Sequence, residues 1–562
     1  MQHYIKSVEC LDCGHHAPFH HSVTSCPKCN STWREIRYDL DALSTTWEKV
    51  IKARPFNLWR YREMLPIQNL NPDLFMGEGG TPFIRAVNLG LMLANQNIFI
   101  KDERQGPTSS FKDRQAAVSI AALKESGISE LVIASTGNVA LAYSAYAARA
   151  GIKLWTFLTS LVPASKMREV GLYGSQVVKV TGSYDQAKQI AAEFARQRGV
   201  HFDLGSRSIP CIESMKTIAY EIVEQLSEYQ LANNENNNPN AARYPVPDWY
   251  IQSVSGGMGP LGVYKGFCEL LQMGWVDRIP KLAIIQVEGC SPMVKAWKQD
   301  QEIADPVRSP KTLIHTLATG DPGRAYTLLR NKMLSGSGGA FESVTDEEAF
   351  RALHILAKME GFSIEPAAAV AFAGLIKLVR SGVIKSHETV VVNCSGHAMP
   401  VERNILGDDW SGNLFSPSET LEESHEEGLL AALSNVAIDR FPRIAIVDDN
   451  PDVRRLIRKI LESQGNYQIN EATNGKEAIE LIKIEKPNLV LLDLMMPEVD
   501  GFSVLDAMQA DSATAEIPVI VITAKELTTD EKDHLRGRIQ SLVQKGDLIS
   551  DKLAEEVRGL LG

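Results

Sequence analysis

The sequence lacks any run of about 18 apolar residues, the length that a membrane-spanning helix requires. Its first ten residues, MQHYIKSVEC, contain no apolar stretch of the kind found in secretion signals. No internal repeat is visible along the chain. These absences favour a cytoplasmic enzyme or regulator and predict that the protein has no membrane partner.

The net charge of -11 is not shared evenly along the 562 residues. Residues 443–562 carry 15 Lys and Arg against 22 Asp and Glu, and residues 408–442 carry one base against eight acids. Such an acidic C-terminal part repels a phosphate backbone, so no nucleic-acid partner is expected. The content of 44% hydrophobic and 23% charged residues is that of soluble globular domains, which excludes disordered, collagen-like and coiled-coil proteins.

Strand-like and helix-like patterns alternate from about residue 76 to 407, and the alternation restarts at Arg443. Such alternation predicts mostly parallel, doubly wound α/β sheets. The Asn-rich segment 233–243 interrupts the pattern and is predicted to be a surface insertion. We therefore expect an α/β protein of four segments. These are a Cys- and His-rich module (1–35), a large α/β domain that begins with a helical connector (36–407), an acidic linker (408–442) and a second α/β domain (443–562).

Four of the eight cysteines form two Cys-x2-Cys pairs near the N-terminus, Cys10 with Cys13 and Cys26 with Cys29. Each pair presents two thiolates from one tight turn, and two such turns complete a tetrahedral zinc site. Because four thiolates leave no open coordination position, the spacing predicts a structural zinc ribbon rather than a catalytic zinc. The neighbouring histidines remain alternative ligands: His15, His16, His20 and His21.

A lysine and three polar loops occur where a parallel sheet binds its ligands. Lys112 follows two serines at a predicted helix start, and loops 135–138, 255–259 and 395–396 each follow a predicted strand. Open α/β sheets bind ligands at the C-terminal ends of their strands. A glycine-rich turn at a helix start binds phosphate, and a lysine in a partly desolvated pocket forms imines with aldehydes. Together these features indicate pyridoxal phosphate as a cofactor.

Seven stretches spread over about 330 residues resemble those of threonine synthases. They are GEGGTPF (77–83), SSFKDRQ (109–115), STGN (135–138), VTGSYDQA (180–187), ESMKTIAYEI (213–222), VSGGMG (254–259) and SGHA (395–398). Threonine synthases are fold-type II pyridoxal-phosphate enzymes of the tryptophan synthase β superfamily and often begin with a zinc ribbon. The resemblance implies two doubly wound α/β subdomains, a homodimer, an amino-acid substrate, and a lyase that converts O-phosphohomoserine into L-threonine.

The resemblance also implies roles for individual residues. Lys112 would be the catalytic residue, because it would hold the cofactor covalently and transfer protons. The other cofactor contacts implied are Asn138 at the 3-hydroxyl, the backbone N–H groups of Gly256, Gly257, Met258 and Gly259 at the phosphate, and Ser395 at the pyridine nitrogen. Ser135 and Thr136 would bind the substrate carboxylate.

One position departs from the family pattern in a way that bears on the substrate. Cys211 stands where threonine synthases have an arginine that binds the substrate phosphate. The departure predicts poor use of O-phosphohomoserine, unless Arg207 replaces that arginine. The alternatives are another β- or γ-elimination or replacement, such as serine or threonine deamination or a sulfite-using synthase, or an amino-acid sensor with little turnover.

The C-terminal domain places polar residues at the ends of four predicted strands. They are Asp448 and Asp449 after the first strand, Asp493 after the third, Thr523 at the end of the fourth and Lys545 after the fifth. Three converging carboxylates repel one another without a cation, and oxygen ligands of this kind suit Mg²⁺. A carboxylate beside Mg²⁺, with a lysine and a hydroxyl nearby, can accept a phosphoryl group.

This arrangement resembles a response-regulator receiver domain over residues 443–562, a (βα)5 flavodoxin-like fold. The resemblance implies Asp493 as the phosphorylated residue, with Thr523 and Lys545 contacting the phosphoryl group. It implies Mg²⁺ bound by Asp448, Asp449, Asp493 and the backbone carbonyl of Met495. It further implies a two-component phosphorelay in which a sensor histidine kinase or a phosphotransfer protein regulates the enzyme. Leu542 replaces the aromatic switch residue usual in receivers.

Overall fold

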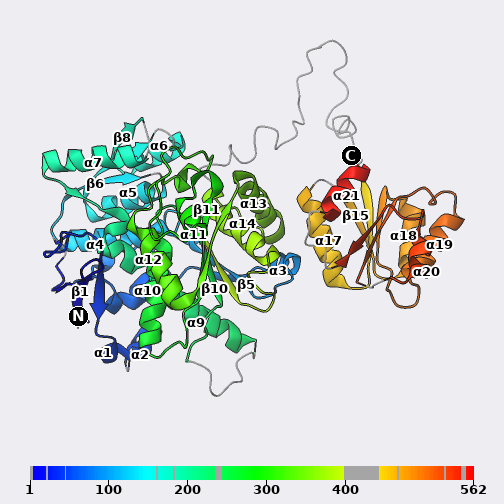
Figure 1. Ribbon diagram of the computed structural model, residues 1–562, viewed down its shortest axis with the longest axis horizontal. Coiled ribbons are helices and arrows are strands. Elements are labelled where there is room, and N and C mark those ends of the chain that lie inside the picture. The colour runs from blue at the N-terminus through cyan, green and yellow to red at the C-terminus, as the bar shows by residue number, and fades with distance from the viewer. Residues whose placement is uncertain are drawn as a thin grey trace, which may run out of the picture. The chain divides into compact units, whose positions relative to one another are not determined.

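The computed structural model describes residues 4–20, 23–44, 46–135, 137–159, 162–181, 184–233, 243–397, 442–464, 467–524, 527–545 and 552–561 (Figure 1). These residues form two compact units, one built mainly from the part before residue 398 and the other mainly from the part after residue 441. Most of the Asn-rich segment 233–243 and of the acidic linker 408–442 lies outside the described residues. Among the described residues, no helix has the length and apolarity needed to cross a membrane.

The N-terminal module is an antiparallel sheet of three strands in the order β2-β1-β3. The strands are β1 (Ile5–Cys10), β2 (His16–Ala17) and β3 (Arg34–Tyr38), so the sheet extends past residue 35. Ile36 and Tyr38 of β3 are buried in the core of the large domain. The connector that follows is helical, as predicted: α1 (Leu40–Ser44), α2 (Trp47–Lys52) and the 3-10 helices η1 (Leu58–Met64) and η2 (Pro72–Leu74).

The larger α/β sheet has six strands in the order β12-β11-β10-β13-β5-β4, parallel except for β4. The strands are β4 (Phe83–Arg85), β5 (Ile98–Asp102), β10 (Trp249–Ser253), β11 (Lys281–Val287), β12 (Gly339–Val344) and β13 (Val390–Cys394). The central strands β5, β10 and β13 are buried at every position. Full burial requires cover on both faces, which explains their nearly continuous apolar sequences.

The smaller sheet has four parallel strands in the order β8-β7-β6-β9. They are β6 (Glu130–Ser135), β7 (Lys153–Thr159), β8 (Gln176–Val180) and the short β9 (His201–Phe202). The two sheets, one wholly and one mostly parallel, agree with the predicted pair of doubly wound subdomains. The strands β5, β6, β7, β8, β10, β11 and β13 coincide with short β-branched or apolar runs of the sequence, whereas β4, β9 and β12 have no clear sequence signal.

Helices connect the strands of the two sheets. They are α3 (Val87–Met92), α4 (Lys112–Glu125), α5 (Asn138–Ala150), α6 (Ala164–Leu172), α7 (Tyr184–Arg198), α8 (Ile209–Met215), α9 (Thr217–Ala232), α10 (Met258–Gln272), α11 (Pro292–Lys298), α12 (Arg324–Lys332), α13 (Asp346–Glu360) and α14 (Pro366–Arg380). Shorter turns are η3 (Glu103–Gln105), η4 (Gly205–Arg207), η5 (Glu288–Cys290), η6 (His315–Leu317) and the π-helix η7 (Met333–Ser337).

The C-terminal unit contains a parallel sheet in the order β15-β14-β16-β17-β18. Its strands are β14 (Arg443–Val447), β15 (Gln468–Ala472), β16 (Leu489–Leu492), β17 (Val519–Thr523) and β18 (Ser541–Gln544). Its helices are α17 (Pro451–Gln464), α18 (Gly475–Glu485), α19 (Gly501–Ala510), α20 (Thr529–Leu535) and α21 (Lys552–Leu561). Helices α17 and α21 supply one apolar cluster, and α18, α19 and α20 supply the other (Figure 1).

Candidate active site, cysteine cluster and phosphoacceptor site

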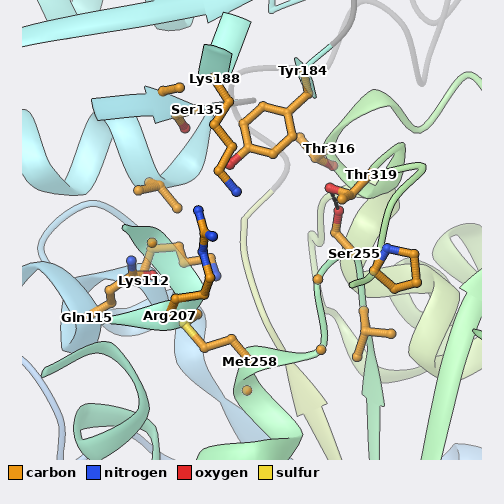
Figure 2. Close-up of a pocket in the computed structure, with 18 of the residues that line it drawn as sticks. Lys112, Gln115, Ser135, Tyr184, Lys188, Arg207, Ser255, Met258, Thr316 and Thr319 are labelled. Carbon is orange, nitrogen blue, oxygen red and sulfur yellow. Dashed lines mark hydrogen bonds between the residues drawn. The ribbon is translucent and has the colours of Figure 1, made fainter. Parts of the chain in front are cut away.

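A cavity of about 580 Å³ is lined by residues from both parallel sheets of the large domain (Figure 2). Ser135 lies at the end of β6, and Ser395 follows the end of β13. Asn138 and Met258 are the first residues of α5 and α10, and Lys112 is the first residue of α4. All five residues line the cavity, so the structure brings together the loops that the sequence had placed separately at strand ends.

Lys112 lies in a desolvated part of this cavity. Burial lowers the pKa of its ammonium group to about 7, and the carboxylate of Glu365 acts in the opposite direction. Its Nζ atom lies 4.2 Å from the centre of the Phe111 ring. An amine with a pKa near 7 is about half neutral at neutral pH, so Lys112 can act as a nucleophile and can exchange protons.

Buried ion pairs fix the N-terminal end of α4. Arg114 is almost fully buried, and its guanidinium donates to the carboxylates of Glu103 and Glu221 at 2.6–2.8 Å. The buried carboxylate of Asp113 accepts two hydrogen bonds from Thr108, at 3.0 Å from the backbone and 2.6 Å from the hydroxyl. The backbone that carries Lys112 is therefore held on both sides, and the direction of its side chain depends little on local flexibility.

The glycine-rich turn after β10 forms the start of α10. Gly257 is the residue that precedes the helix and has a φ of 77°, a left-handed conformation that favours glycine. The first backbone N–H groups of α10 have no partners within the helix and, with the helix dipole, favour a phosphate. The cavity therefore has a lysine and an anion-binding helix start, which is the donor set that pyridoxal phosphate requires. Ser255 donates a hydrogen bond from its hydroxyl to that of Thr319 (Figure 2).

Asn138 is held by two charged residues that the sequence analysis did not single out. Its amide nitrogen donates to both carboxylate oxygens of Glu365, and its carbonyl oxygen accepts a hydrogen bond of 2.5 Å from Lys166. Glu365 directly precedes α14 and lines the cavity. Its only sequence signal is the proline that follows it at the helix start, which marks the helix and not a site.

The hydroxyl of Ser135, which the family resemblance assigns to the substrate carboxylate, is bound to the backbone of its own loop. Its Oγ atom accepts hydrogen bonds from the backbone N–H groups of Gly137 at 3.1 Å and Ala140 at 3.0 Å, so it caps the start of α5. Its hydroxyl proton can still be donated to a ligand in the cavity. Thr136 lies outside the described residues.

Two cations face each other in the cavity. Figure 2 shows the side chain of Arg207 extending toward the ammonium group of Lys188, with Tyr184 beside it. Burial, reinforced by the positive charge of Arg207, lowers the pKa of Lys188. The buried Nε atom of Arg207 has no hydrogen-bond partner among the described residues. Lys188 lies one residue beyond the VTGSYDQA stretch, and no sequence pattern indicated that it faces the cavity.

Cys211 does not line this cavity. Its side chain is fully buried in the hydrophobic core beside Ile212 and Met215 of α8. Arg207, which ends η4, lines the cavity instead. Cys211, which departs from the family pattern, thus lies in the core, whereas Arg207, the candidate to replace the missing arginine, lies in the cavity.

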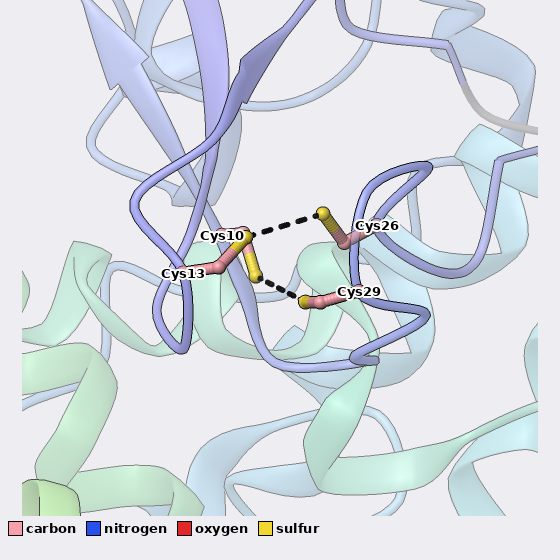
Figure 3. A group of neighbouring side chains, drawn as sticks. All are labelled: Cys10, Cys13, Cys26 and Cys29. Carbon is pink, nitrogen blue, oxygen red and sulfur yellow. Dashed lines mark hydrogen bonds between the residues drawn. The ribbon is translucent and has the colours of Figure 1, made fainter.

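The four N-terminal cysteines converge as predicted (Figure 3). Their sulfur atoms all lie within 4.8 Å of one another. The Sγ atoms of Cys10 and Cys29 are 3.5 Å apart, and those of Cys13 and Cys26 are 3.7 Å apart. A tetrahedral site with Zn–S distances of about 2.3 Å has S–S edges of about 3.8 Å, so the cluster fits a structural zinc ion.

The acidic residues of the C-terminal unit also converge. Asp448 and Asp493 are buried, and Lys545 places its Nζ atom 2.7 Å from an oxygen of each. Asp449 is exposed beside them, and the three carboxylates form one cluster. Burial raises the pKa of Asp448, and the charge of Asp493 adds to that shift. Two buried carboxylates around one lysine leave a net negative site, which suits a divalent cation.

Two further residues of this site lie where the sequence placed them. Thr523 is the buried last residue of β17. Met495 is half exposed, and its backbone N–H donates to the carboxylate of Asp493 at 3.2 Å. Leu542 lies in β18 and packs partly buried against the core, so an aliphatic side chain occupies the strand position at which receivers usually carry an aromatic.

Residues 74–396 match the family model described as pyridoxal-phosphate dependent enzyme. The chain belongs to this family. It is 32% identical over 400 residues to the threonine synthase of Methanosarcina acetivorans, an alignment that covers 71% of this chain and 93% of the relative. It is 32% identical over 392 residues to the threonine synthase of Methanocaldococcus jannaschii, covering 69% and 92%. The protein is therefore a threonine synthase-like pyridoxal-phosphate enzyme, as the sequence motifs predicted.

The comparisons also confirm the fold class and the C-terminal domain. Diaminopropionate ammonia lyase from Escherichia coli shares the fold with a TM-score of 0.50 at 14% identity, over 67% of this chain and 95% of that chain. Residues 444–557 match the response regulator receiver domain. The pyridoxal-phosphate enzyme thus carries a receiver domain at its C-terminal end, and a receiver implies a phosphorelay partner.

Proposed function

We propose that this enzyme releases phosphate from O-phosphohomoserine and adds water to give L-threonine. The observation that carries the proposal is the pair of cations, Arg207 and Lys188, that face each other in the cavity (Figure 2). A phosphate dianion between them would be held by charge-assisted hydrogen bonds. It would also offset the repulsion by Arg207 and the desolvation, which lower the pKa of Lys188. Arg207 thus takes the place of the arginine that Cys211 replaces.

The start of α5 is the proposed binding site for the substrate carboxylate. Gly137 has a φ of 143°, and the N-terminal N–H groups of α5 lie directly after it. A helix N-terminus favours an anion there, and Ser135 can donate its hydroxyl proton to it. Thr136 is the second proposed contact. A carboxylate here and a phosphate at Arg207 would define both ends of the substrate.

The proposed cofactor contacts follow from the same cavity. Pyridoxal phosphate, when bound, withdraws electrons from the carbons of the substrate that lose and gain protons. Lys112 would hold the cofactor and move protons at its Nζ atom, for which a pKa near neutrality is suited. Asn138 and Ser395 would orient the ring, and the N–H groups of residues 256–259 would bind the phosphate. Glu365 would keep Asn138 in place.

In the other sites, we propose a structural zinc ion at the four cysteines and Mg²⁺ at Asp448, Asp449, Asp493 and the carbonyl of Met495. Asp493 would accept a phosphoryl group, with Thr523 and Lys545 contacting it. The partner proposed is a sensor histidine kinase or a phosphotransfer protein. The position of Lys545, 2.7 Å from both buried aspartates, supports this assignment because an ammonium group stabilises added negative charge.

The test is a kinetic comparison of purified full-length variants loaded with pyridoxal phosphate. Release of phosphate and formation of threonine are measured with O-phosphohomoserine, alongside deamination of L-serine and L-threonine. Arg207→Gln and Lys188→Gln should each raise KM for the phosphorylated substrate by about 10- to 100-fold, the usual effect of losing one charge-assisted pair. Arg196→Gln, on the exposed face of the same α7, is the matched control and should change nothing.

Preferential deamination of L-serine or L-threonine, with no turnover of O-phosphohomoserine, would replace the proposal with the ammonia-lyase alternative. No turnover of any amino acid, together with spectral evidence that one of them binds, would favour the sensor alternative.

A further inference from the structure

The N-terminal module that contains the four clustered cysteines, called the ribbon below, contributes part of the wall of the active-site cavity. Trp33, which directly precedes β3, lines the cavity. So does Arg324, the first residue of α12. The Nε atom of Arg324 forms an ion pair with the carboxylate of Asp12, and an Nη atom donates to the backbone carbonyl of Leu11 at 3.4 Å. Asp12 and Leu11 are the two residues between Cys10 and Cys13.

Hydrogen bonds join these ribbon residues into one cluster. The hydroxyl of Ser31 donates to the carboxylate of Asp12 at 2.5 Å and accepts from the backbone N–H of Trp33 at 3.1 Å. The backbone N–H of Leu11 donates to the carbonyl of Trp33 at 3.0 Å. Leu11 and Asp12 lie inside the first cysteine pair, and Ser31 and Trp33 follow the second. The geometry of this cluster therefore depends on how the two cysteine pairs are held together.

Arg324 also connects the ribbon to the loop of residues 319–323, which directly precedes α12 and forms part of the cavity wall. Thr319, Asp321 and Gly323 of this loop all line the cavity. Thr319 accepts a hydrogen bond from Ser255, which begins the glycine-rich turn proposed to bind the cofactor phosphate. A continuous set of contacts thus leads from Asp12 through Arg324 and residues 319–323 to that turn.

We propose that the ribbon is a positioning element of the active site: Asp12 fixes Arg324 and residues 319–324, and Trp33 closes the same side of the cavity. The inference rests on the proposed function for the choice of substrate, but the contacts themselves do not depend on it. A metal ion at the four sulfur atoms would fix the positions of Leu11, Asp12 and Trp33 relative to one another. Asp12 and Arg324 are positioning residues in this scheme, because they act through the shape of the cavity.

The pair is suited to mutation because it is only partly buried. The side chains of Arg324 and Asp12 are 40% and 31% exposed. Ion pairs of this exposure contribute little to folding stability. The variants Asp12→Asn and Arg324→Gln should therefore fold, retain zinc and bind pyridoxal phosphate, while the loop loses its anchor.

The experiment uses the full-length holoenzyme and two measurements. The first is KM and kcat for O-phosphohomoserine. Asp12→Asn and Arg324→Gln should each raise KM by roughly 3- to 10-fold and change kcat by less than about 2-fold, and the double variant should be no worse than either single one. The control is Glu9→Gln, which breaks the 2.5 Å pair with Arg37 in the same ribbon and should leave both constants unchanged.

The second measurement is hydrogen–deuterium exchange of residues 319–324, which needs no substrate. Exchange there should be faster in Asp12→Asn than in the parent enzyme and unchanged in Glu9→Gln. If O-phosphohomoserine is not turned over but exchange responds as stated, the proposed function fails and this inference stands. Unchanged exchange in Asp12→Asn, with zinc content equal to that of the parent, would overturn the inference, since the ribbon would then only stabilise the fold.

Discussion

The amide nitrogen of Asn138 lies 2.8 and 3.0 Å from the two carboxylate oxygens of Glu365 and donates a hydrogen bond to each. Lys166 donates to the carbonyl oxygen of the same amide. The amide nitrogen donates to a carboxylate and the amide oxygen accepts from an ammonium group. Turning the amide over would break all of these hydrogen bonds, so only one orientation is favourable. Asn138, the proposed contact of the cofactor ring, is therefore set in place before any ligand enters.

Glu365→Gln should weaken retention of pyridoxal phosphate. Glutamine offers one acceptor in place of two, so Asn138 loses a hydrogen bond. The change also removes the negative charge that opposes the effect of burial on Lys112, so the pKa of Lys112 should fall further. We expect a loss of about 1–2 kcal/mol in cofactor affinity, a factor of roughly 5 to 30, measured by absorbance titration. The control is the exposed Glu347→Gln; equal affinities in the two variants would contradict the role of Glu365.

Uptake of pyridoxal phosphate by the cofactor-free protein should depend on pH near neutrality. Only the neutral amine of Lys112 is nucleophilic, and burial lowers its pKa to about 7. The uptake rate should therefore rise with pH, reach half its maximum near pH 7 and level off about one pH unit higher. Stopped-flow absorbance over this range measures the midpoint. A rate that keeps rising to about pH 10, the range of an ordinary lysine, would show that Lys112 is not desolvated in solution.

Substitutions of Cys211 should affect stability rather than substrate binding. Cys211→Ser should leave KM for O-phosphohomoserine within about 2-fold, because the side chain is in the core and not in the cavity. Cys211→Arg, which restores the residue usual in the family, should destabilise the enzyme by about 3–5 kcal/mol because it buries an unpaired charge. Thermal unfolding and steady-state kinetics measure both effects. A lower KM in Cys211→Arg would show that this position does reach the substrate.

Removal of the zinc ion should destabilise the N-terminal module. Structural thiolate sites contribute on the order of several kcal/mol to folding, so Cys10→Ser should lose both metal and stability. Metal analysis of the parent protein should give one zinc ion per chain. The matched control is Cys268→Ser, a cysteine of α10 away from the cluster, which should keep its zinc. A parent protein without zinc would refute the assignment.

Asp493 should take up a phosphoryl group from a small donor only when Mg²⁺ is present, and Asp493→Asn should abolish this reaction. The expected effect on the enzyme is a change in turnover. Covalent fusion raises the effective concentration of one domain at the other to roughly the millimolar range. Phosphorylation changes turnover only if the receiver interacts differently in its two states.

Three forms of the protein test this coupling. Kinetics are compared for the full-length enzyme with and without a phosphoryl mimic, and for a shortened chain that ends near Ser416. Because Leu542 lacks the aromatic ring of the usual switch, a conformational signal would have to use another element, such as Thr523 and the loop after it. Identical kinetics in all three forms would assign the receiver to localisation or partner choice instead of catalytic control.

The sequence by itself was enough to predict which polar groups lie at the C-terminal ends of strands. Asp448, Asp493 and Lys545 each follow a short apolar run, and such runs become parallel strands whose C-terminal ends meet at one edge. The same argument located the loops around Ser135, Gly257 and Ser395. The cysteine spacing fixed the ribbon, because two tight turns leave few other ways to arrange four thiolates.

Only the tertiary structure decided which helix residues reach the cavity. Lys188 and Glu365 come from α7 and from the residue before α14, and neither has a sequence pattern that distinguishes it from a solvated charge. Arg207 ends η4 and Cys211 lies in α8, with the extended Ser208 between them, yet Cys211 enters the core and Arg207 the cavity. Which side chain enters which environment depends on how η4 and α8 pack against their neighbours. That packing involves residues far away in the sequence, which no local pattern contains.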